Sequence, residues 1–126
     1  MNLHTKLFFA IASLFLIVIS CKKSKIVADS CSYNSCDARR KTLMVATDWR
    51  GTLGYYNDLR KWAVNVSIPN TIDGLRTCII CTDLSDSLKV MGKSVTFSGE
   101  LKESCNDPKP VFRGQEIYFV TPNKLR

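Results

Sequence analysis

Alternation of apolar and polar side chains over short segments limits this chain to β-structure. In residues 61–68, Trp62, Val64, Val66 and Ile68 fall on one face of an extended chain, and the residues between them fall on the other. A period of two residues is typical of a strand with one buried face. Segments rich in β-branched and aromatic residues predict five strands, at residues 43–56, 61–68, 75–82, 94–101 and 116–121. The chain is therefore predicted to be all-β with one short helix.

The helix is predicted between the third and fourth strands. Leu84, Leu88 and Met91 recur at intervals of four and three residues, and Gly92 follows as a stop signal. This spacing predicts a short helix over residues 83–91.

The order of these elements indicates a barrel. Three strands, a helix and two strands follow one another, and Gly51 and Gly54 interrupt the first strand where a long strand would bulge and bend. This is the order of the OB-fold, a five-stranded and partly open barrel. Residues 92–101, in which one glycine precedes an alternating strand and another lies within it, resemble the fourth strand of many OB barrels. A small five-stranded OB-like barrel is expected over residues 42–126.

An apolar run that ends at a cysteine precedes the barrel. Lys6 supplies a positive charge, residues 7–19 supply the apolar run, and Ser20 places a small residue before Cys21. This arrangement is typical of a secretory signal peptide. The run is shorter than the roughly 20 residues that a membrane-spanning helix needs, which favours a signal over an uncleaved anchor.

The end of the signal resembles the lipobox of bacterial lipoproteins in the sequence Val18-Ile19-Ser20-Cys21. With residues 92–101 and 114–119, the chain is similar to small envelope lipoproteins that carry one OB-like domain. The resemblance implies that Cys21 is acylated, palmitate being a typical acyl group, and becomes the first residue. Cys21 would then anchor the chain to membrane lipid in the cell envelope, facing the periplasm or the cell exterior.

Three regions are therefore predicted. Residues 1–20 are the lipoprotein signal peptide, residues 21–41 a polar, flexible tether, and residues 42–126 the barrel. Removal of the signal leaves enough chain for one small domain and no more. A coil of roughly twenty residues reaches on the order of 25 Å from the membrane.

The positive net charge of the chain favours anionic partners but does not indicate which kind of anionic partner it binds. The formal net charge is +7, but the lysines and arginines are spread along the chain instead of forming a block. Acidic glycans, anionic small molecules, envelope proteins and the membrane surface all fit this balance. Nucleic acid is an unlikely partner in the expected compartment.

The common catalytic arrangements are excluded by composition. The single histidine, His4, lies in the predicted signal peptide. A mature chain without histidine has no Ser-His-Asp or Cys-His mechanism and no histidine zinc site or haem ligand. Asp83 and Asp86 are better explained as first-turn residues of the predicted helix, where they meet the positive end of its dipole. No enzyme activity, metal or cofactor is expected.

Five cysteines remain after Cys21. They are Cys31, Cys36, Cys78, Cys81 and Cys105. An oxidising envelope favours structural disulfides, and an odd number leaves at least one cysteine unpaired within the chain. The pair Cys78 and Cys81 lies in a predicted strand, where the two thiols would point to opposite faces. A redox pair or a four-thiolate zinc site stays an alternative, and the pairing is left open.

Candidate ligand-binding residues come from the loops that flank the second and third strands of an OB barrel. The loops are residues 56–60 and 102–113, and their candidates are Tyr55, Tyr56, Arg60, Lys109, Phe112 and Arg113. Aromatic and basic side chains together can stack on rings and meet anionic groups. Solvated loops and ordinary core aromatics are the competing explanation.

Two classes of function remain. The first is a lipid-anchored, non-enzymatic binding or accessory module of the cell envelope. The second is a cysteine-based redox or metal-handling protein in the same place.

Overall fold

The computed structural model describes residues 29–126, which are almost entirely β-structure. Its strands are β1 (Thr42–Tyr56), β2 (Lys61–Ser67), β3 (Leu75–Ile80), β4 (Ser94–Glu103), β5 (Gln115–Val120) and β6 (Lys124–Leu125). The first five coincide with the predicted strands, whereas β6 has too few residues to show an alternation. The predicted all-β class is confirmed. The predicted signal peptide and Cys21 lie outside the described residues.

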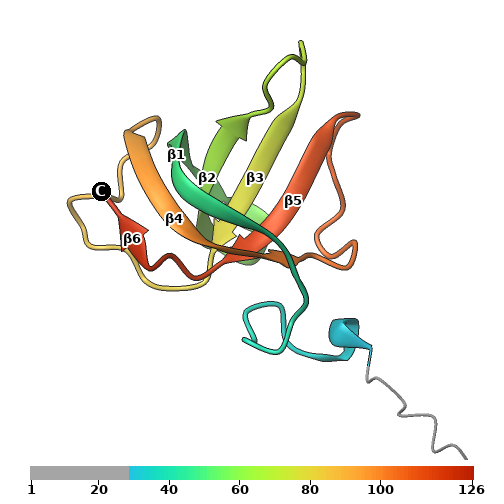
Figure 1. Ribbon diagram of the computed structural model, residues 1–126. Helices are drawn as coiled ribbons and strands as arrows, with labels where there is room; N and C mark the ends of the chain where they lie inside the picture. Colours follow the sequence, from blue (N-terminus) through green and yellow to red (C-terminus); the bar gives the residue numbers. More distant parts are fainter. Residues whose placement is uncertain (1–28) are drawn as a thin grey trace, which may run out of the picture.

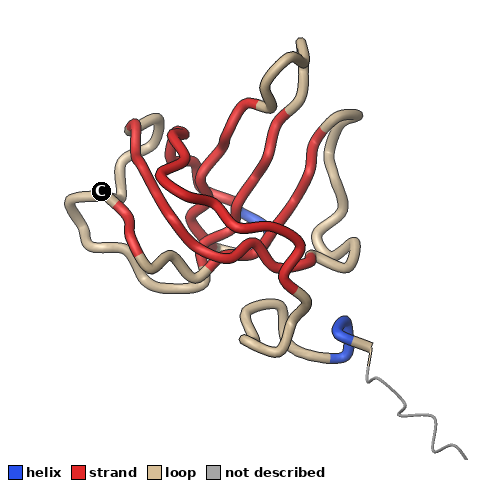
Figure 2. The backbone as a smooth tube through the Cα atoms, viewed as in Figure 1, coloured by secondary structure: helices blue, strands red, loops and turns tan. Residues whose placement is uncertain are grey.

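The strands form one sheet that closes on itself. Their order is β1-β2-β3-β5-β4-β6, and β1 also pairs with β4, which closes the first five strands into a barrel (Figure 1). Neighbouring strands are antiparallel, except that β3 and β5 are parallel. Figure 2 shows that long strands make up the barrel wall and that helical turns are short. The arrangement is consistent with the predicted OB-like barrel.

Strand β1 is long and bent, as predicted. Its register with β4 shifts at two places, the second of which lies between Ala46 and Trp49. Asp48 lies within that irregularity at a φ of 48°, a left-handed conformation that aspartate tolerates better than most residues. Gly51 permits a close approach to β2, because a Cβ there would lie 2.5 Å from the carbonyl oxygen of Asn65. The bend lets β1 pair with β4 first and with β2 afterwards.

The main hydrophobic core fills the barrel. Alternate residues of β4 point inward, and Val95, Phe97 and Leu101 are almost fully buried. Trp49 packs edge to face against Phe97 with ring centroids 6.3 Å apart. The buried residues of this core are Ala46, Leu53, Val64, Cys78, Ile80, Leu84, Val95, Phe97, Leu101, Tyr118 and Val120.

The predicted helix over residues 83–91 is wrong, because that segment consists of turns. Leu84 is buried, but Met91 is 65% exposed, so the apolar spacing does not produce a buried stripe. A helix this short is marginal unless packing supports it. Serine side chains also compete with helical backbone bonding, and the segment contains Ser85 and Ser87. Asp83 and Asp86 therefore do not lie in the first turn of a helix, and the predicted interaction with a helix dipole is wrong.

The segment predicted as a flexible tether is bonded to the barrel over its described part. Cys31 forms a disulfide with Cys105 in the β4–β5 loop, and Cys36 forms one with Cys81 directly after β3. The predicted role of cysteines as structural disulfides is confirmed for these four residues. From residue 31 onward the chain is therefore part of the domain and does not swing freely.

A buried arginine fixes the same segment from within. Arg40 is only 6% exposed. Its guanidinium donates to the carbonyl oxygen of Glu103 at 3.1 Å and to that of Tyr33 at 2.7 Å. These bonds hold the start of β1, the end of β4 and the disulfide-bonded segment together.

Within residues 29–126, no helix is long and apolar enough to cross a membrane.

Reduction of the two disulfides is expected to lower the melting temperature by more than about 10 °C. The bridges close loops with sequence separations of 74 and 45 residues, and a native bridge typically stabilises a small domain by about 2–4 kcal/mol. Each kcal/mol corresponds to roughly 4–8 °C in a domain of this size. Thermal unfolding followed by circular dichroism, with and without dithiothreitol, measures the shift.

Variants in which Cys31 and Cys105, or Cys36 and Cys81, are both replaced by serine separate the two bridges. A protein that lacks all four cysteines serves as the control, because the reductant should leave its melting curve unchanged. An identical curve for oxidised and fully reduced wild type would contradict the prediction.

Candidate functional site

The predicted binding loops lie at opposite ends of β2 and β3. Tyr55 and Arg60 line a hollow beside Trp62, where β2 begins. Phe112 and Arg113 line another beside the β2–β3 turn, where β3 begins. Neither of these hollows includes a residue of the other loop, so Tyr55 and Arg60 form one group and Phe112 and Arg113 another.

The outer face of β2, β3 and β5, which lies between these groups, carries a second small core. Ala63, Ile79, Ile117 and Phe119 are buried there, on the side opposite the barrel interior. Cys36, Leu59 and Cys81 pack against this cluster. The disulfide-bonded segment and the β1–β2 turn therefore cover part of the face that OB barrels generally use for binding.

Polar side chains continue the same face toward the β2–β3 turn. The Thr77 hydroxyl donates to the Asn65 amide oxygen at 3.1 Å and accepts from the Gln115 amide nitrogen at 3.0 Å. The Gln115 amide oxygen accepts from the backbone N–H of Val111 at 2.7 Å, which ties the β4–β5 loop to this row. These hydrogen-bonding groups are satisfied within the protein and do not await a ligand.

Cys78 is the free cysteine among the described residues, and its thiol is buried in the barrel core. Cys81 points to the other face and is bonded to Cys36, so the expectation that the two thiols diverge is confirmed. Burial raises the pKa of the Cys78 thiol to about 12, and the nearby Arg76 only partly offsets this effect. A protonated, buried thiol is neither a good nucleophile nor a metal ligand.

One group of potential metal ligands occurs within residues 29–126. It comprises Cys31, Cys105 and Glu103. Both sulfur atoms are joined in a disulfide, so neither can donate a thiolate. This group holds no metal in its oxidised form.

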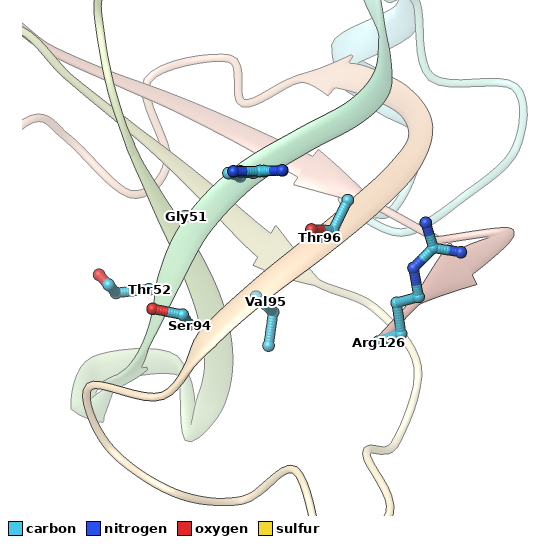
Figure 3. A pocket seen from close by; sticks show the side chains of 7 residues that line it. Gly51, Thr52, Ser94, Val95, Thr96 and Arg126 are labelled. Carbon is cyan, nitrogen blue, oxygen red and sulfur yellow. The ribbon is translucent and has the colours of Figure 1, made fainter.

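A shallow hollow lies on the barrel wall where β1, β4 and the end of the chain meet. We call it the arginine hollow and define it by Arg50, Thr52, Ser94, Thr96 and Arg126, with Gly51 and Val95 completing its lining. Its volume is about 470 Å³. Figure 3 shows the side chains of Thr52, Ser94, Thr96 and Arg126 arranged along the two strands and the adjoining chain end.

Strand register brings these residues together. Arg50 lies directly across from Thr96, and Thr52 lies across from Ser94. Residues two positions apart point to the same face of a strand, so the four side chains share one face of the β1–β4 ladder. The backbone of Arg126 exchanges two hydrogen bonds with that of Thr96, at 2.8 and 3.0 Å. Each residue of the hollow is therefore positioned by paired backbone.

The side chains that line the hollow include two arginines and no carboxylate. The nearest acidic side chain, that of Asp48, has an oxygen 3.9 Å from the Arg126 guanidinium. That carboxylate accepts a hydrogen bond from the Lys124 ammonium at 2.7 Å, which lowers its pKa. Asp48 is thus mainly the partner of Lys124, and Arg126 remains 67% exposed.

Sequence reasoning missed the arginine hollow. Its residues occupy the polar positions of alternating strands, which the sequence presents as an ordinary solvated face. The sequence feature that could have indicated the hollow is the pair Arg50 and Thr52 on one strand, which faces the pair Ser94 and Thr96 on another. It became visible only through the register between two strands that are far apart in the chain.

No protein-family model matches the chain, and no curated protein matches it.

The Cys78 thiol is expected to stay protonated and unreactive in the folded protein. Its pKa is about 12 when folded against the ordinary value of 9.0, so the unfolded chain loses this proton first as pH rises. Its contribution to the unfolding free energy is therefore constant below about pH 9 and falls between about pH 9 and pH 12. Denaturant unfolding of wild type and Cys78→Ala at several alkaline pH values measures the difference.

Wild type should lose stability more steeply with pH than Cys78→Ala, while the two slopes should agree near neutral pH. A thiol reagent should modify Cys78 only after unfolding. Rapid modification of the native protein near pH 8 would contradict the buried, protonated state.

Proposed function

We propose that this protein is a lipid-anchored binding module of the bacterial cell envelope without catalytic activity of its own. Cys21 provides the attachment to membrane lipid, and the OB-like barrel provides the binding surface. The partner is an anionic molecule or an envelope component that carries an anionic group. The protein faces the periplasm or the cell exterior.

The two disulfides are the observation that carries this proposal. Disulfides persist in oxidising compartments and are rare in the cytosol. Cys31 and Cys36, which follow the predicted signal peptide, are both bonded to the barrel. A chain exported by the apolar run at residues 7–19 would meet the conditions in which these bonds form.

The position of the first disulfide suits a membrane anchor. Only ten positions separate Cys21 from Cys31, the first residue bonded to the barrel. A coil of that length spans roughly 15–20 Å on average and about 35 Å at full extension. The barrel would thus be held within about 35 Å of the bilayer.

The chemistry of the arginine hollow supports binding over catalysis. Its side chains offer guanidinium groups and hydroxyls, with no carboxylate, thiol or imidazole to act as a general base. The single histidine of the chain, His4, lies in the predicted signal peptide. Groups of this kind recognise anions but do not activate a nucleophile.

The redox or metal-handling alternative receives less support. A redox cysteine is usually accessible and has a lowered pKa. The free thiol of Cys78 is buried and its pKa is raised. Cys81, its neighbour in the Cys-x-x-Cys sequence, is bonded to Cys36 instead.

Replacing Cys21 by serine is expected to release the protein from the membrane. The lipobox resemblance makes the Cys21 thiol the acceptor of the diacylglyceryl group, and two or more acyl chains give stable anchoring. Wild type should sediment with membranes and incorporate labelled fatty acid in cells. Cys21→Ser should do neither.

Cys36→Ser is the matched control, since it removes a cysteine outside the lipobox and should remain lipidated and membrane-bound. If Cys21→Ser incorporated fatty acid and sedimented as wild type does, the lipoprotein proposal would be wrong.

A further inference from the structure

We infer that the arginine hollow binds a phosphate or sulfate group carried by a soluble or polymeric ligand. The inference rests on the proposed role as a binding module and names the chemistry that this module would recognise.

The two guanidinium groups supply the attraction. Within residues 29–126, Arg50 forms no ion pair, and the nearest carboxylate to Arg126 already accepts from the Lys124 ammonium. Two positive side chains therefore line one hollow, and the carboxylate that lies near Arg126, that of Asp48, is shared with Lys124. A guanidinium presents a planar fork of N–H donors that matches the oxygens of an oxyanion. An anion between the arginines would relieve their repulsion and gain charge-assisted hydrogen bonds.

The hydroxyls favour a tetrahedral anion over a carboxylate. Thr52, Ser94 and Thr96 line the hollow, and their hydroxyls form no hydrogen bond with the rest of residues 29–126. Each can donate one hydrogen bond. Donors on two strands and an adjoining chain end approach from several directions, which suits the oxygens of phosphate or sulfate better than the two coplanar oxygens of a carboxylate.

The floor of the hollow is already ordered. Arg50 and Thr96 belong to the paired ladder of β1 and β4, and two backbone hydrogen bonds fix Arg126 beside Thr96. The side chains that must lose freedom when a ligand binds are the two arginines and, to a smaller extent, the short hydroxyl residues. Such preorganisation lowers the entropic cost of binding.

Size and position favour a soluble or polymeric ligand over a lipid headgroup. The volume of about 470 Å³ exceeds what one phosphate group fills, so the hollow has room for the body that carries it. The β1–β4 ladder runs from Thr42 to Thr52, and the hollow lies at its far end from the disulfide-bonded segment that leads to Cys21. In Figure 1 the start of β4 and the C-terminus lie away from the end at which residue 29 enters. The hollow therefore lies at the end of the ladder opposite the disulfide-bonded segment, which favours a ligand from solution.

Calorimetric titration of the full-length protein in neutral detergent tests the inference. The probes are inorganic phosphate, glucose 6-phosphate, glucose, acetate and a short-chain phosphatidylglycerol below its micellar concentration. At low ionic strength we expect saturable binding of inorganic phosphate and glucose 6-phosphate, with a dissociation constant on the order of 1 mM or below. Acetate should bind more weakly, glucose should not bind, and added salt should weaken the phosphate complexes.

The variant Arg50→Ala/Arg126→Ala should bind glucose 6-phosphate at least about tenfold more weakly, because each lost charge-assisted contact is worth roughly a factor of ten. Lys41→Ala/Lys89→Ala is the matched control, since it removes the same net charge from other parts of the surface. It should bind as wild type does. Melting curves of both variants establish that each is folded.

Four results would overturn the inference. Absence of saturable phosphate binding would remove the anion site, and equal losses in the two variants would show an effect of net charge alone. Binding of the short-chain lipid without binding of either soluble phosphate would assign the hollow to a headgroup. If Lys109→Ala/Arg113→Ala lost binding while Arg50→Ala/Arg126→Ala retained it, the hollow would be the wrong site but the proposed binding role would stand. Failure of the proposed function is seen separately, in the fractionation of Cys21→Ser.

Discussion

The pairing of β1 with β4 is the constraint on which the rest of this molecule depends. It closes the first five strands into a barrel and buries Phe97 inside that barrel. The irregularity at Asp48 and the close approach at Gly51 allow one strand to pair with β4 and then with β2. The same ladder sets Arg50 across from Thr96 on its outer face. Closure of the barrel and formation of the arginine hollow therefore have one physical origin.

The disulfides hold a segment of chain over part of the usual binding face of an OB barrel. Cys36 brings its segment onto the outer surface of β2, β3 and β5 and helps to bury Ile79 and Phe119. The polar row at Thr77 satisfies its own hydrogen bonds. A ligand on this surface would have to displace covalently attached chain. The exposed wall formed by β1 and β4 carries no such cover, and its arginines remain without a dedicated counterion.

Most of the fold was readable from the sequence, because a strand with one buried face leaves a period-two pattern that needs no knowledge of its neighbours. The helix at residues 83–91 was predicted wrongly, since apolar spacing cannot show that Leu84 is buried and Leu88 partly packed against the core while Met91 stays exposed. Five cysteines permit several pairings, and only the folded chain selects Cys105 for Cys31 and Cys81 for Cys36. The arginine hollow could not be predicted from the sequence for a related reason, because it depends on the register between two strands that are far apart in the chain.

Anchor and barrel geometry together give the proposed module an orientation. If Cys21 holds the chain in the bilayer, the disulfide at Cys31 shortens the tether between the lipid and the barrel to ten residues. The sequence had predicted a tether of about twenty. In the proposed lipoprotein, so short a connection would keep the side bearing Cys105 within reach of the lipid. The arginine hollow, at the far end of the β1–β4 ladder, then meets the solvent of the compartment. Its positive charge attracts anions from that solvent over about one Debye length, roughly 8–10 Å at moderate salt. In the proposed lipoprotein the disulfides would thus do more than stabilise a small domain, because they would also set where the barrel is attached to the anchored segment.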